Sequence, residues 1–141
     1  MTAERFIILE DDPWHAEVME RLLKESFPLV KVEILLTEKM FREAFEAMAG
    51  NPPLAVILDQ MLPWTEEDDP DSKAGAPAEG PLRAGTRCFE RLQRDPRTKD
   101  LPVVFFSHLD ASHFPPGVRA VRKSADPKLK KLVQLLKEVA T

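Results

Sequence analysis

Residues 54–63 read LAVILDQMLP, a run of five apolar residues that leads directly into Asp59 and is closed by Pro63. The apolar run is too short for a typical helix and shows no alternation, so it predicts a strand that is buried on both faces. Pro63 prevents this strand from continuing within the centre of a sheet. In open parallel α/β sheets, ligands bind outside the carboxyl ends of the strands. We therefore expect Asp59 where a reactive group would be displayed.

Four further segments are predicted strands. Residues 6–9 and 103–106 are continuously apolar, whereas residues 30–35 and 118–121 mostly alternate apolar and polar side chains. Predicted helices lie between and after the strands, at 13–23, 37–50, 85–95 and 126–139. This alternation predicts an α/β fold, a doubly wound five-stranded parallel sheet with helices on both faces. Placing the continuously apolar strands in the centre gives the strand order 2-1-3-4-5.

The helical patterns also predict which side chains face the core. Asp12-Pro13 opens the first helix, in which Trp14, Val18, Leu22 and Leu23 form the expected buried stripe, and His15 is expected on the surface. Asp126-Pro127 opens the last helix, whose apolar face runs from residue 129 to residue 139.

Length and composition limit the classes of function. At 141 residues we expect one domain, residues 1–141, and the net charge of −4 provides no general attraction to nucleic acid or to an anionic membrane. We therefore expect this domain to bind neither nucleic acid nor membrane. The sequence contains no signal-peptide pattern and no apolar run of membrane-spanning length, and its single cysteine fits a reducing compartment. These features predict a cytoplasmic location.

Five polar residues lie at the carboxyl ends of the predicted strands: Glu10, Asp11, Asp59, Ser107 and Lys123. In the order 2-1-3-4-5 they would converge on one pocket. Three carboxylates packed together repel one another and need a cation, and oxygen ligands suit Mg²⁺, or Mn²⁺ in its place. Lys123 can pair with phosphate oxygens, to which the Ser107 hydroxyl can donate. With Asp59 as nucleophile, this set is suited to forming an aspartyl phosphate.

These motifs resemble the receiver domain of two-component response regulators, a flavodoxin-like fold, and the resemblance covers the chain except residues 64–84. It implies that Asp59 accepts a phosphoryl group from a histidine kinase or phosphotransfer protein. It further implies that Glu10 and Asp11 hold magnesium, and that Met61 lends its backbone carbonyl to the metal.

The same resemblance implies a signalling switch. Ser107 would turn toward the phosphoryl group, and Lys123 would pair with it. Members of the family often hydrolyse their own phosphate, and the phosphorylated form shifts a conformational equilibrium that is passed on by protein–protein contacts. The sequence names no downstream partner, and it leaves open whether the domain counts as an enzyme.

The chain departs from the family pattern at four places. Ser124 replaces the proline after the lysine, Ala120 replaces an aromatic residue, and His108 stands where a small residue is usual. Residues 110–116 replace most of the fourth helix. These departures favour an alternative function, a pseudo-receiver that keeps the fold as an interaction module without phosphorylation.

Residues 64–84 form an insertion directly after the Asp59 loop, rich in Pro, Gly, Ala and acidic residues. Two interpretations stay open, a lid or docking loop specific to a partner, and a solvated loop.

Two enzyme classes of similar architecture are rejected. A haloacid-dehalogenase-type phosphatase needs a second carboxylate two residues after its nucleophile, where this chain has Met61. A flavodoxin needs a phosphate loop rich in Ser, Thr and Gly after the first strand, where this chain has the acidic run 10–12.

Overall fold

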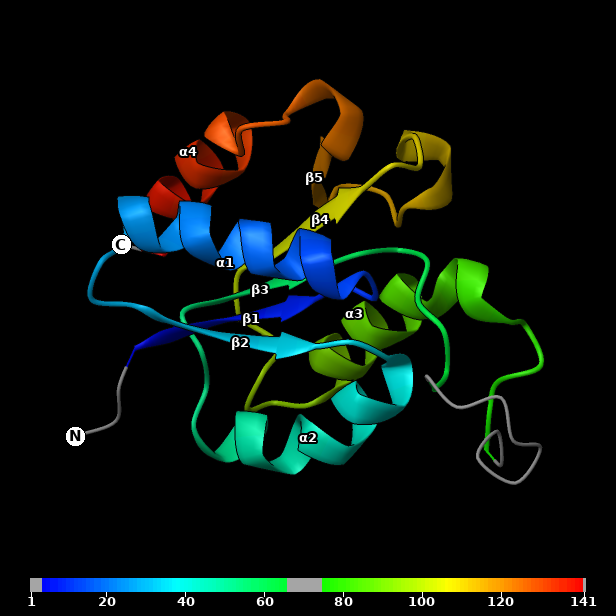
Figure 1. Cartoon of the computed structure of the whole chain (residues 1–141). Helices are drawn as coiled ribbons and strands as arrows, with labels where there is room; N and C mark the ends of the chain where they lie inside the picture. The colour runs from blue at the N-terminus through cyan, green and yellow to red at the C-terminus, as the bar shows by residue number, and fades with distance from the viewer. Residues whose placement is uncertain (1–3, 66–74, 141) are drawn as a thin grey trace.

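The computed structural model describes residues 4–65 and 75–140. Five parallel strands form one sheet in the order β2-β1-β3-β4-β5 (Figure 1), which confirms the predicted topology. The strands are β1 (Arg5–Leu9), β2 (Lys31–Leu35), β3 (Ala55–Leu58), β4 (Val103–Ser107) and β5 (Arg119–Arg122). All carboxyl ends therefore lie along one edge of the sheet.

Helices cover both faces of the sheet. The helices α1 (Pro13–Ser26) and α4 (Lys130–Val139) lie on one face, and α2 (Glu38–Gly50) and α3 (Ala84–Arg94) lie on the other (Figure 1). Among the described residues, the connections contain the short 3-10 helices η2 (Pro81–Arg83), η3 (Ala111–His113) and η4 (Lys123–Ala125). Within the described parts of the chain, no helix has both the length and the apolar content to cross a membrane.

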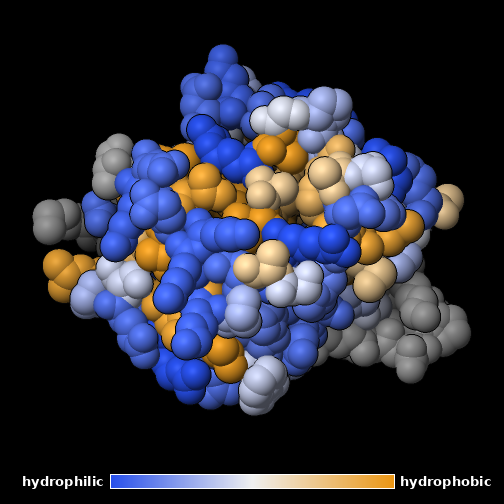
Figure 2. Space-filling view, turned by 90° about the horizontal axis from the view of Figure 1, so that it is seen from above, coloured by the Kyte–Doolittle hydropathy of each residue, from blue (hydrophilic) through white to orange (hydrophobic). Residues whose placement is uncertain are grey.

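Two apolar clusters, one on each face of the sheet, form the core. The α2/α3 side contains Phe41, Phe45 and Leu92, and the α1/α4 side contains Met19 and Leu136. Strands β1, β3 and β4 are buried almost throughout, whereas β2 and β5 have exposed positions, as expected for the edges. The outer surface over α1 and α4 is mainly hydrophilic, with apolar side chains showing in patches (Figure 2).

The first helix starts as predicted, but its predicted buried stripe is only partly correct: Leu23 is buried and Leu22 packs against the core, whereas Trp14 is not buried. The Asp12 carboxylate accepts hydrogen bonds from the backbone N–H groups of the first turn. The buried side chains are Ala16, Met19 and Leu23, while Trp14 is 71 % exposed. The reason is that the first turn lies at the rim of a cavity beside the sheet, so Trp14 has little beneath it to pack against.

The last helix begins later than predicted. Residues Lys123–Ala125 form η4, and α4 starts at Lys130, after Leu129 with a left-handed φ of 58°. Asp126 nevertheless caps the helix, because its carboxylate accepts hydrogen bonds from the backbone N–H groups of Lys131 (3.0 Å) and Leu132 (2.9 Å). The sequence thus correctly predicts Asp126 as the cap of the last helix, but it does not predict the turn between Asp126 and Lys130.

The connection between β4 and β5, all of it among the described residues, contains η3 and no longer helix, which confirms the prediction that residues 110–116 replace most of the fourth helix. Phe114, directly after η3, packs on Phe105 of β4 with ring centroids 5.2 Å apart. The β5 residue in register with Phe105 is the exposed Ala120. Much of the insertion, residues 66–74, lies outside the described residues, and α3 begins at Ala84, the last residue of the predicted insertion.

Candidate functional site

A cavity of about 500 Å³ lies at the carboxyl edge of the sheet. All five predicted polar residues line it: Glu10, Asp11, Asp59, Ser107 and Lys123. Trp14, His15 and Met61 also contribute to its wall. Residues more than one hundred positions apart in the chain thus meet because the parallel strands end together.

Lys123 joins two of the three acids. Its Nζ lies 2.7 Å from Asp59 Oδ2, 2.8 Å from Glu10 Oε2 and 3.0 Å from Glu10 Oε1. All three side chains are at least nine-tenths buried. The η4 turn, which begins at Lys123, gives this lysine its inward position at the end of β5.

The charges of this buried group perturb one another. Burial raises the pKa of the Glu10 carboxyl, and its contact with Asp59 adds to the rise, which Lys123 and His15 only partly offset. Burial opposes the charge of Lys123, but the carboxylates of Asp59 and Glu10 outweigh it and raise the pKa of the lysine. The ammonium therefore stays charged at neutral pH and partly neutralises the acids.

The carboxylates also fit a hard divalent cation. Carboxylate oxygens of Glu10, Asp11 and Asp59 lie within 4.8 Å of one another, and Asp11 is exposed to the cavity. Mg²⁺ prefers oxygen ligands, and these three converging carboxylates are the donor set that would hold such an ion. Because Lys123 contacts both Glu10 and Asp59, a cation held by these carboxylates would compete with the lysine for their oxygens.

Two further contacts define the surroundings of Asp59 and Ser107. The backbone N–H of Met61 lies 3.4 Å from Asp59 Oδ1, so each Asp59 oxygen has a neighbouring donor. The Ser107 Oγ accepts a hydrogen bond from the backbone N–H of Leu109 at 3.3 Å. That bond uses an oxygen lone pair, and the Ser107 O–H can still donate to a ligand.

His15 is a site residue that the sequence interpretation placed on the surface. Its Nδ1 lies 2.5 Å from Glu10 Oε1, and its ring stacks on Phe106 with centroids 6.3 Å apart. The cap at Asp12 puts His15 in the first turn of α1, next to the end of β1, which was the available signal. The imidazole thus contacts the Glu10 carboxylate from α1, beside the cavity.

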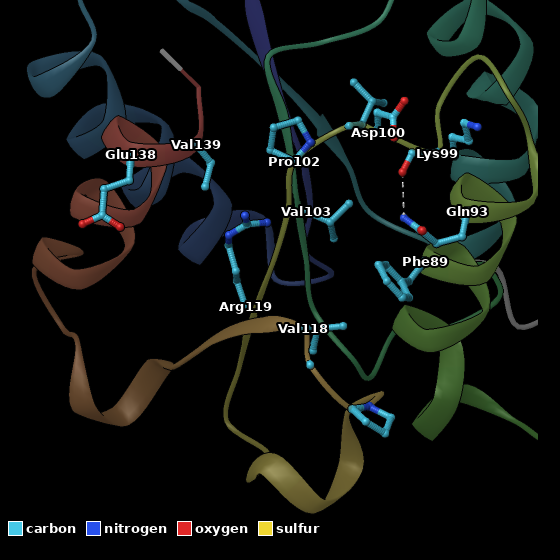
Figure 3. Close-up of a pocket in the computed structure, with 13 residues that line it drawn as sticks. Phe89, Gln93, Lys99, Asp100, Pro102, Val103, Val118, Arg119, Glu138 and Val139 are labelled. Carbon is cyan, nitrogen blue, oxygen red and sulfur yellow. Dashed lines mark hydrogen bonds between the residues drawn. The ribbon is translucent and has the colours of Figure 1, made fainter.

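A second cavity, of about 560 Å³, lies beside α3 and does not include Glu10, Asp11 or Asp59. Figure 3 shows Phe89 and Gln93 of α3 on one side of it, and Arg119, Glu138 and Val139 on the other. The dashed line marks the hydrogen bond from Gln93 Nε2 to the carbonyl of Lys99. None of the five predicted polar residues lines this groove, which lies where β5 lacks a covering helix.

No protein-family model and no curated protein sequence matches the chain. Solved structures do match in shape. The signal receiver domain of a DNA-binding response regulator from Colwellia psychrerythraea superimposes with a TM-score of 0.66 and 21 % identity, covering 96 % of this chain and 98 % of that one.

Two further matches come from response regulators. The phosphorylated cyanobacterial phytochrome response regulator RcpA gives a TM-score of 0.64 and 21 % identity, covering 98 % of this chain and 91 % of that one. The Mn²⁺-bound form of response regulator Rcp1 gives a TM-score of 0.62 and 19 % identity, covering 96 % of this chain and 91 % of that one. This chain has the receiver-domain fold. The receiver fold explains why the polar residues gather at one edge, since that edge contains the switch point between β1 and β3.

Proposed function

We propose that the chain is a receiver domain that accepts a phosphoryl group on Asp59 from a histidine kinase or a phosphotransfer protein. The observation that carries this proposal is the buried contact of Lys123 with both Asp59 and Glu10, within a cluster of three carboxylates. The similarity in shape to a phosphorylated and to a Mn²⁺-bound response regulator supports it. Of the two interpretations from sequence, phosphoryl transfer accounts for the meeting of Glu10, Asp11, Asp59 and Lys123 in one cavity.

The transfer uses Asp59 as nucleophile. A carboxylate oxygen attacks phosphorus, the bond from phosphorus to the donor histidine nitrogen breaks, and its electron pair returns to the ring. Lys123 then pairs with a phosphoryl oxygen in place of the oxygen that it contacts on Asp59, and Ser107 donates its O–H proton to another. Water can later attack phosphorus, which breaks the bond from phosphorus to the Asp59 oxygen, releases inorganic phosphate and restores the carboxylate. This is the self-dephosphorylation that the family resemblance implies.

We assign Mg²⁺, or Mn²⁺ in its place, to this site. Glu10, Asp11 and Asp59 would hold the ion through carboxylate oxygens, and Met61 through its backbone carbonyl. When bound, the ion supplies neutralisation of the negative charge on the phosphoryl oxygens. His15 maintains the orientation of Glu10 through its 2.5 Å contact.

The phosphorylated form passes its signal on through protein–protein contacts, and we expect the exchange to take place in the cytoplasm. Neither nucleic acid nor membrane is part of the proposal.

Beryllofluoride, a phosphoryl analogue, tests the proposal together with Mg²⁺. In a Trp64→Phe background, Trp14 is the remaining tryptophan, and it lines the cavity. We expect a change in Trp14 fluorescence that needs both Mg²⁺ and beryllofluoride and disappears in Asp59→Asn. Acetyl phosphate should also add the mass of one phosphoryl group to the protein but not to Asp59→Asn. A folded protein that responds in neither assay would contradict the proposal.

The second candidate is the pseudo-receiver, an interaction module without phosphorylation. Exposure of Ala120, opposite Phe105, favours it, because β5 then lacks the aromatic side chain expected at that position. The two candidates differ in one measurable property, since only the phosphoacceptor binds beryllofluoride in a magnesium-dependent way.

A further inference from the structure

Gln60, the residue directly after the nucleophile Asp59, is a completely buried polar side chain that the proposed chemistry does not use. Its Nε2 donates to Thr86 Oγ1 at 2.7 Å, and its Oε1 accepts from the backbone N–H of Thr86 at 2.7 Å. The backbone N–H can only donate, so this contact fixes which end of the amide is which. The second Nε2 proton goes to the backbone carbonyl of His113.

The first two bonds tie Gln60 to the N-terminal turn of α3. The backbone adds a third link, because Gly85 N–H donates to the Gln60 carbonyl at 2.9 Å. Side chain and main chain of Gln60 are thus both attached to α3, and the end of β3 cannot shift without disturbing buried hydrogen bonds.

The bond to His113 reaches a different part of the fold. His113 is the last residue of η3, the short turn between β4 and β5, and Phe114 follows it and packs on Phe105. One amide therefore bridges the residue next to the nucleophile and the segment that stands in place of a covering helix. Ser107, at the end of β4, begins the same connection.

Loss of any partner would leave a buried amide group unsatisfied, which is unfavourable. Keeping all three bonds requires that the groups they join move together. We propose that Gln60 is a positioning residue that couples the Asp59 loop to residues 110–114, so that occupation of Asp59 changes the conformation of that segment. The part that concerns Asp59 occupation rests on the function proposed above.

Amide hydrogen exchange tests the link without any phosphoryl chemistry. The substitution Gln60→Leu removes all three side-chain bonds at similar volume. We expect exchange at the His113 and Phe114 amides, which donate within η3, to accelerate about five- to tenfold, while amides of β4 are unchanged. Gln60→Met, of equal chain length, provides the same comparison if the leucine variant does not fold. Unchanged η3 exchange in a folded variant would overturn the inference.

Two matched variants control for a general loss of packing. Gln93→Leu makes the same substitution on α3, where the Gln93 amide bonds only to the exposed carbonyl of Lys99, and η3 exchange should stay at the wild-type rate. Thr86→Ser keeps both the hydroxyl and the N–H that Gln60 contacts, and it should also behave like wild type. Accelerated exchange in either control would show that the effect is not specific to the Gln60 amide.

Beryllofluoride with Mg²⁺, followed by amide resonances, tests transmission. In the wild type we expect shifts at Asp11 and Ser107 and also across residues 110–114. In Gln60→Leu the shifts at Asp11 and Ser107 should persist, while those at 110–114 fall at least threefold. Equal shifts of the segment in both proteins would overturn transmission through Gln60. A wild type without shifts at Asp11 and Ser107 would instead contradict the proposed function, and hydrogen exchange would still decide whether Gln60 holds η3.

Discussion

Gly85 of α3 lies so close to Asp59 that a Cβ at residue 85 would stand 2.5 Å from the Asp59 carbonyl oxygen. It would also stand 2.7 Å from the Cα and from Oε1 of Gln60. The obstacles include main-chain atoms, which cannot turn aside as a flexible side chain can. The start of α3 therefore supports the Asp59 loop directly, by contact of backbone on backbone.

The substitution Gly85→Ala should destabilise the protein. The added methyl group must displace the backbone of Asp59 and Gln60, and we expect a loss of about 1–3 kcal/mol in the free energy of unfolding. Urea denaturation measures it. Gly50→Ala is the matched control, because a Cβ there meets nothing within 4 Å, and it should leave stability equal or about 0.5 kcal/mol higher. Equal stability of wild type and Gly85→Ala would contradict the close contact.

Removing the ammonium of Lys123 should expose the repulsion between the acids. Lys123→Met leaves Glu10 and Asp59 buried without their counter-charge, and we expect a loss of about 3 kcal/mol in unfolding free energy without metal. Mg²⁺ should stabilise this variant more than it stabilises the wild type, because the ion no longer competes with the lysine. Thermal unfolding with and without Mg²⁺ measures both effects.

The control for this experiment is Lys128→Met, which changes an exposed lysine after the same strand and should alter stability by less than about 0.5 kcal/mol. A similar Mg²⁺ effect in all three proteins would show that Lys123 and the ion do not share the same carboxylates.

Asp11 should separate metal binding from folding. Asp11 is exposed and does not contact Lys123 as Glu10 and Asp59 do. The substitution Asp11→Asn should therefore leave stability within about 0.5 kcal/mol of wild type. Its carboxylate is one of three converging oxygen ligands, so the affinity for Mg²⁺ should fall by about tenfold or more. Calorimetric titration measures the affinity. The neighbouring Asp12→Asn, which keeps the helix cap, should change affinity much less.

Acid sensitivity should depend in part on Asp95. Hydrogen bonds from Arg97 lower the pKa of Asp95 to about 2. A lowered pKa in the folded state means that the contribution to stability is present above the unfolded-state value near 4 and is lost between about pH 4 and pH 2. In Asp95→Asn this loss should be absent, so the stability difference from wild type should be present at pH 7 and shrink below pH 4. Urea midpoints across this range, with Asp100→Asn as control, measure it.

The fold was predictable because burial differs strongly between strands. The sequence of β3 is continuously apolar, which predicts a central position, and that of β5 alternates, which predicts an edge. Together with the acidic residues at the strand ends, these patterns predict the strand order. Convergence of the polar residues then follows from the shared direction of the strands. Their chemical roles stay predictions.

The details that sequence missed depend on tertiary contacts. The apolar spacing in α1 allows more than one buried face, and only the position of its first turn at the cavity rim explains the exposure of Trp14. The contact between His15 and Glu10 joins two elements whose relative placement no local pattern specifies. Likewise, α4 starts later than the sequence predicts because η4 intervenes, at whose first residue Lys123 points inward to Asp59.

The placement of Lys123 gives the chain an internal counter-ion. The Lys123 ammonium partly neutralises the carboxylates of Glu10 and Asp59, so folding does not require a bound metal ion. A chelator should therefore remove the ion while the native structure persists. If the chain acts as proposed, divalent cations would control the reaction at Asp59, whereas the fold itself would not depend on their supply.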